Sequence, residues 1–86
     1  MAKGSWAATA ADSVLVAADT YRGSIELQHT AGSPVSIGFG EAGVVGQGIK
    51  LAATSPYYLI NDHRARMAIH GICDTGLTAS GGYQTA

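Results

Sequence analysis

Hydrophobic and polar residues alternate along much of the chain with the two-residue period of β-strands. The clearest example spans residues 22–30, where Ile25, Leu27 and His29 share one face and polar side chains share the other. This period is typical of a half-buried antiparallel strand. Residues 35–39 alternate in the same way after a turn containing Gly and Pro. We therefore expect the two segments to form a β-hairpin at the centre of the core.

Short β-prone segments follow one another along the rest of the chain, separated by Gly, Pro, Asn, Asp and Ser, and helical periodicity is almost absent. The glycine-rich segment 40–48 predicts a loop. Six to eight short strands at a spacing of roughly 8–12 residues predict an all-β fold, a small antiparallel β-sandwich or barrel. The additional strands are expected at residues 14–17, 49–52, 57–60, 66–73 and within 77–86.

The first residues lack this alternation. Residues 1–11 are rich in Ala, Gly, Ser and Thr, and Trp6 is their only large side chain. This composition predicts a flexible N-terminal arm at 1–11, followed by a single β domain at 12–86. Trp6 either folds back onto its own domain or inserts into a neighbouring protein, because Trp is enriched at interface hot spots.

Composition limits how stable such a domain can be. Val, Ile, Leu and Phe supply 17 of the 86 residues, whereas Ala and Gly supply 27. A small domain with a thin core is commonly stabilised by disulfides, metals or oligomerisation. Cys73 is the only cysteine, which excludes an intrachain disulfide and a cysteine-based zinc site. Oligomerisation or docking on a partner is the remaining source of stability.

The charge pattern narrows the class of partner. The formal net charge is −1, and the five basic residues are scattered along the sequence, so we expect no nucleic-acid partner. No segment has the length of a membrane span or the hydrophobic region of a secretory signal. These features predict a soluble protein made in a reducing cytoplasm, with no membrane partner.

Few residues are of the types that catalyse reactions or bind metal ions. His29, His63 and His70 fall on different expected elements, and Cys73 aligns with apolar residues on an inward face, so we expect no metal site, no cofactor and no enzyme activity. The glycines at 38–48 lack the following helix of a phosphate-binding loop.

Three aromatic residues are candidates for partner binding. Tyr57 and Tyr58 either pack within the domain or join Trp6 as partner-binding residues. A sugar site built on the two tyrosines is a further alternative.

Three segments carry a resemblance to a known class of protein. They are YRGSIELQHT at 21–30, GSPVSIGFG at 32–40 and GIKLA at 48–52. Within residues 13–73 the pattern resembles small β-sandwich virion proteins of tailed bacteriophages, although His29 stands where that pattern has Asn.

The resemblance implies a structural virion protein, most specifically a capsid decoration or cement protein that binds the major capsid protein and stabilises the assembled head. It also implies a homo-oligomer, with a trimer favoured, made in the bacterial cytoplasm and located in the virion. A phage tail or head-fibre component and a carbohydrate-binding β module are the alternatives. The shared motifs are structural, so no functional residue is carried over.

Overall fold

The computed structural model describes residues 3–85, which form eight β-strands and one short 3₁₀ helix. This confirms the all-β class predicted from the two-residue alternation. In chain order the elements are β1 (Lys3–Ala8), β2 (Ser13–Val16), β3 (Ile25–Gly32), β4 (Val35–Phe39), β5 (Ile49–Leu51), β6 (Tyr57–Ile60), η1 (His63–Arg66), β7 (Ile69–Ile72) and β8 (Ala79–Thr85).

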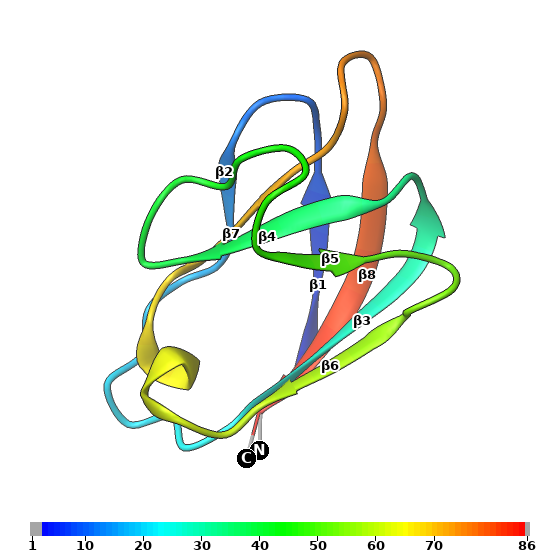
Figure 1. Ribbon diagram of the computed structural model, residues 1–86. Coiled ribbons are helices and arrows are strands. Elements are labelled where there is room, and N and C mark those ends of the chain that lie inside the picture. The colour runs from blue at the N-terminus through cyan, green and yellow to red at the C-terminus, as the bar shows by residue number, and fades with distance from the viewer. Residues whose placement is uncertain (1–2, 86) are drawn as a thin grey trace.

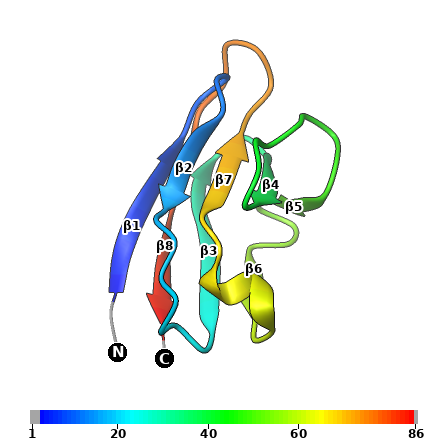
Figure 2. The same cartoon turned by 90° about the vertical axis from the view of Figure 1, so that its left-hand side faces the viewer.

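The strands form two four-stranded antiparallel sheets that pack face to face as a β-sandwich (Figures 1 and 2). The first sheet has the order β1-β8-β3-β6 and the second has the order β2-β7-β4-β5. Strands β1 and β2 lie at one side of the sandwich, and β6 and β5 form the edges of the two sheets at the other side. Helix η1 connects β6 of the first sheet to β7 of the second.

The core lies between the two sheets and is made by the inward faces of the alternating strands. Ile25 and Leu27 of β3 are fully buried, as are Val35 of β4 and Ile69 of β7. Glu26, between Ile25 and Leu27 on β3, is exposed, which is the behaviour expected of a pleated strand. The core also contains many small residues, so its apolar volume is modest.

The predicted hairpin of residues 22–30 and 35–39 is wrong. β3 lies in the first sheet between β8 and β6, so both of its edges are already hydrogen-bonded and none is left for β4. The chain instead crosses from one sheet to the other at Gly32, whose φ of 96° is unfavourable for other residues. The Ser33 N–H then donates to the Thr78 carbonyl (2.9 Å), which fixes the crossing. β3 and β4 therefore face each other across the core.

The predicted N-terminal arm also needs correction. Residues 3–8 form strand β1, which pairs with β8 in continuous register from Lys3 opposite Gln84 to Ala8 opposite Ala79. Trp6 is only 4% exposed, and its indole Nε1–H donates to the Gly82 carbonyl at 3.1 Å. The ring lies against Gly81, where any side chain would collide with it. Residues 3–8 thus belong to the β domain because Trp6 supplies part of its thin core.

The segment expected as one strand at 66–73 is shorter in the structure. Asp62 caps η1 by accepting a hydrogen bond from the Arg64 N–H at 2.9 Å, and the helix extends to Arg66. Only Ile69–Ile72 then continues as strand β7. The glycine-rich segment 40–48 forms a loop without strand structure, as predicted.

Candidate functional site

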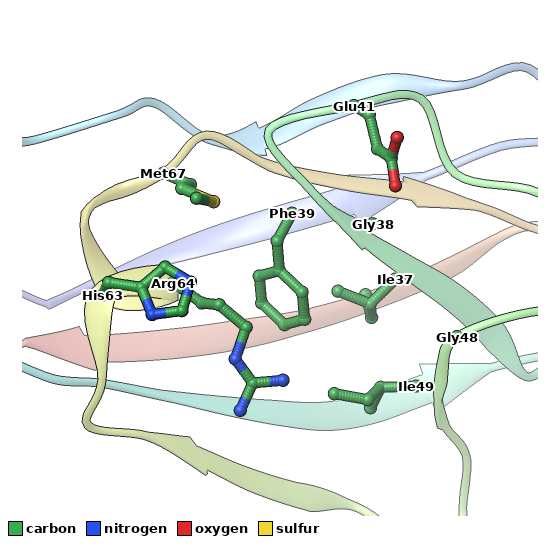
Figure 3. Close-up of a pocket in the computed structure, with 9 residues that line it drawn as sticks. All are labelled: Ile37, Gly38, Phe39, Glu41, Gly48, Ile49, His63, Arg64 and Met67. Atoms are coloured by element: carbon green, nitrogen blue, oxygen red, sulfur yellow. The ribbon is translucent and has the colours of Figure 1, made fainter.

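A cavity with a volume of about 390 Å³ opens between β4, β5 and η1. Figure 3 shows its lining, which comes from three separate parts of the sequence. The lining residues are Ile37, Gly38, Phe39, Glu41, Gly48, Ile49, His63, Arg64 and Met67.

The floor of this cavity is apolar. Ile37 and Ile49 are opposite each other in the β4–β5 register, and Phe39 follows two residues later on the same face of β4. In Figure 3 these three side chains point into the same space, with Met67 nearby. Phe39 and Ile49 are only partly buried, although they pack against the core. The cavity therefore leaves apolar surface of the core accessible from outside.

Arg64 is held in a fixed position at the mouth of the cavity. Its guanidinium forms an ion pair with Asp62 (Nη2 to Oδ2, 3.0 Å), and its Cζ lies 5.2 Å from the centroid of the Phe39 ring. The hydrogen bond from the Arg64 side chain holds the pKa of the Asp62 carboxyl below its usual value. Hydrogen bonding to Asp62, and secondarily to Tyr58, raises the pKa of Arg64. Arg64 is thus a neutralised cation stacked on an aromatic ring.

No pattern in the sequence indicated this site. The cavity joins residues 37–41, 48–49 and 63–67, and none of these segments carries a recognisable binding motif. The local signal that could have indicated part of it is Asp62-His63-Arg64, a capped turn with a short-range acid–base pair. Nothing local indicates that this turn meets β4 and β5.

The histidines and Cys73 are distributed over the fold. His29 is buried next to Trp6 and its Nε2 lies 2.8 Å from the Ser33 carbonyl oxygen, whereas His63 lines the cavity and His70 pairs with Asp12 (3.1 Å). Cys73 is a buried free thiol. Within residues 3–85 no three His, Cys, Asp or Glu side chains gather as a metal-ligand group. The absence of cofactor and enzyme activity stays a prediction.

Asp12 anchors the glycine-rich loop to the second sheet. One carboxylate oxygen accepts a hydrogen bond from the Gly43 N–H at 2.7 Å, and the other lies 3.1 Å from His70 Nδ1. The Gly43 hydrogen bond, with a smaller contribution from His70, holds the pKa of Asp12 below its usual value. A second anchor is the bond from the Gly46 N–H to Ser36 Oγ at 3.1 Å. The loop therefore holds its conformation although its own residues are small.

The three aromatic candidates for partner binding have different environments. Trp6 is buried in the core of its own domain, so it is not available to a partner in this structure. Tyr58 points inward and packs against the core, opposite Leu27. Tyr57 is 62% exposed on the outer face of the first sheet. Tyr57 and Tyr58 thus lie on opposite faces of β6, as adjacent residues of a strand must, and cannot form one binding platform.

Comparisons of the chain with protein-family models, with curated proteins and with solved structures found no match. The resemblance to phage virion proteins expected from the motifs within residues 13–73 stays a prediction, because none of these comparisons tests it. In the part of the chain that the structure describes, no helix has the length and apolar character needed to cross a membrane.

Proposed function

We propose that the protein is a structural docking subunit of a tailed-phage virion, and specifically a capsid decoration protein that binds and stabilises the assembled head. The observation that carries the docking role is on β6. This edge strand presents two large apolar side chains, Tyr57 and Leu59, on the outer face of the first sheet, where they are 62% and 58% exposed. The phage assignment is supported by the sequence motifs.

Neighbouring exposed apolar residues favour a protein interface more than scattered ones do. Tyr57 and Leu59 are two residues apart on one strand, so they lie side by side on the same face. A tyrosine is also among the residue types enriched at interface hot spots. A partner that covered this face would remove both side chains from water and gain the corresponding hydrophobic free energy.

The remaining properties follow from the same proposal. The partner is the major capsid protein, the location is the virion, and the protein acts as a homo-oligomer, with a trimer favoured. It needs no cofactor and catalyses no reaction. Oligomerisation would add stability to a domain whose core contains few large side chains.

Virions of the phage that encodes the protein provide the test. The protein should be present in purified heads in many copies, and heads from which it has been removed should bind it again. The double variant Tyr57→Ala, Leu59→Ala should bind such heads at least about tenfold more weakly, which corresponds to about 1.4 kcal/mol. Tyr21→Ala is the matched control, because Tyr21 is 96% exposed in the β2–β3 connection and away from this face.

The outcome distinguishes the alternatives. Absence of the protein from purified virions would contradict the phage assignment as a whole. Presence in tails or fibres but not in heads would favour the tail or head-fibre component. Circular dichroism of each variant should match that of the unchanged protein, since the substituted side chains are exposed and contribute little to stability.

A carbohydrate-binding module is the second candidate, and one observation favours it. Next to Tyr57, a shallow depression of about 220 Å³ lies over Gly82 on the outer face of the first sheet. Gln28 lines it and its Nε2 donates to the Tyr57 hydroxyl at 3.5 Å. Amides and carboxylates can pair with the hydroxyl groups of a sugar. Binding of a glycan that Tyr57→Ala abolishes, without any binding to heads, would support this candidate.

A further inference from the structure

We propose that the cavity between β4, β5 and η1 receives a lysine-type side chain of the partner, an extended apolar chain that ends in a cation. The inference deepens the proposed docking function, because it specifies the chemistry of one contact. It does not depend on the partner being a capsid protein.

The apolar floor is the first observation. Ile37, Phe39 and Ile49 present hydrocarbon to a cavity of about 390 Å³, near the lower end of the range for ligand pockets, roughly 300–1,000 Å³. This volume is sufficient to admit one long side chain. The methylene groups of such a chain would cover apolar surface that is now accessible to water.

The charge at the mouth is the second observation. Arg64 is already neutralised by Asp62 at 3.0 Å. Glu41 lies across the cavity from Arg64 in Figure 3, and its carboxylate makes no ion pair with any residue from 3 to 85. The uncompensated charge beside the apolar floor is therefore negative. An occupant that is apolar along its length and cationic at its end complements both features.

Matched small probes can test the inference directly. We would titrate the isotopically labelled full-length protein with N-acetyl-lysine N-methylamide and with N-acetyl-norleucine N-methylamide, which has the same linear hydrocarbon chain without the amine. The measurement is made at pH 8, above the usual titration range of histidine. NMR shifts of the Ile49 and Met67 methyl groups report occupancy, because both side chains line the cavity.

The lysine probe should bind about threefold more tightly than the norleucine probe, as expected for a partly exposed ion pair. Glu41→Gln should remove this preference while leaving norleucine binding unchanged. Glu26→Gln is the matched control, because Glu26 is exposed on a strand of the other sheet and should leave the preference intact.

Three results would overturn the inference. The first is the absence of shifts at these methyl groups up to about 50 mM probe, where a millimolar site would be nearly saturated. The second is equal affinity for both probes, and the third is a preference for lysine that survives Glu41→Gln. Because the probes do not involve a virion, failure of the head-binding experiment leaves this result interpretable, and failure of the probes does not decide where the protein is located.

Discussion

Arg22 shows how far a single side chain can differ from its expected role. In the sequence Arg22 is one of five scattered basic residues, and nothing distinguishes it from the others. In the structure, however, it is only 6% exposed. Its guanidinium donates to three backbone carbonyls, those of Ala17 (3.1 Å), Met67 (3.0 Å) and Ala65. These bonds tie the β2–β3 connection to η1 and the residue after it. The planar fork of donors makes arginine suitable for this arrangement.

Replacing Arg22 should destabilise the protein. Arg22→Met keeps most of the side-chain volume but leaves three carbonyls without their donor, and we expect a loss of about 3 kcal/mol or more in the free energy of unfolding. Arg22→Lys should lower the free energy of unfolding by a smaller amount, because the ammonium still supplies a charged donor. Some loss should remain, because an ammonium cannot reach all three carbonyls. Urea denaturation measures both. Arg66→Met, at an exposed position, should change stability by less than about 0.5 kcal/mol, and an equal loss there would contradict the role given to Arg22.

Trp6 has a structural role that can be separated from partner binding. Trp6→Ala should lower the free energy of unfolding by about 3–5 kcal/mol, since it removes a buried indole from a core with few large side chains. Trp6→Phe should lose less, because it keeps an aromatic ring and gives up the bond to Gly82. Tyr57→Ala should leave the urea midpoint nearly unchanged. If Trp6→Ala were equally harmless, the burial of β1 against the core would be in doubt.

At the scale of elements, alternation identified most strands but not their partners. The two-residue period of β3 depends on which residues face the core, and this is visible in the sequence. Whether β3 pairs with β4 depends on whether β8, more than 40 residues later, occupies its other edge. β1 was missed for the same reason, because Ser, Gly and Ala give no alternating pattern and only pairing with β8 defines the strand.

Gly32 allows the chain to change sheets, and two glycine substitutions can test this. Gly32 and Gly76 both have positive φ, at 96° and 77°, but a side chain at Gly32 would collide with the backbone of Thr78 and Ala79, whereas none is near Gly76. Gly76→Ala should cost about 1–2 kcal/mol of stability from backbone strain alone. Gly32→Ala should cost clearly more. Equal losses in urea denaturation would show that the close approach at the crossing is unimportant.

The anchoring of the glycine-rich loop predicts a pH dependence. Because the pKa of Asp12 is lowered in the folded protein, its carboxylate contributes stability that is present above its unfolded pKa and is lost as the pH falls through the folded pKa. Asp12→Asn keeps an oxygen acceptor for Gly43 but no charge. The variant should be less stable than the unchanged protein at pH 7, and the difference should shrink as the pH falls through the folded pKa of Asp12.

Urea midpoints at pH 7 and at a series of lower pH values measure this effect. A deficit of Asp12→Asn that remained undiminished in acid would mean that the carboxylate charge is not its source. The partner groups that matter are Gly43 and His70, since these face Asp12 from the loop and from β7.

The candidate cavity is a property of the whole molecule and could not be predicted from the sequence. The cavity lies where β5 forms the edge of the second sheet and η1 connects the two sheets. Its lining therefore depends on how these separate segments meet in the fold. Phe39 and Met67 look like ordinary core positions in the sequence, but in the structure they line the cavity and are only partly buried. Composition, in contrast, did indicate the thin core correctly, because the number of large apolar residues does not depend on topology.

A core this thin makes self-association an expected source of stability. The accessible surface of 4770 Å² is close to that expected for a compact monomer of this mass. The chain is therefore compact, and the scarcity of large side chains, not an open structure, limits its stability. If stability comes from a homo-oligomer, it must depend on protein concentration. A hundredfold increase should then add about 1.4 kcal/mol per protomer for a dimer or about 1.8 kcal/mol for a trimer, and raise Tm by about 6–14 °C. Calorimetry and light scattering on the same samples measure Tm and mass together. A constant Tm with the mass of a monomer at every concentration would show that the isolated domain is sufficient, and that any additional stability comes from the partner on which it docks.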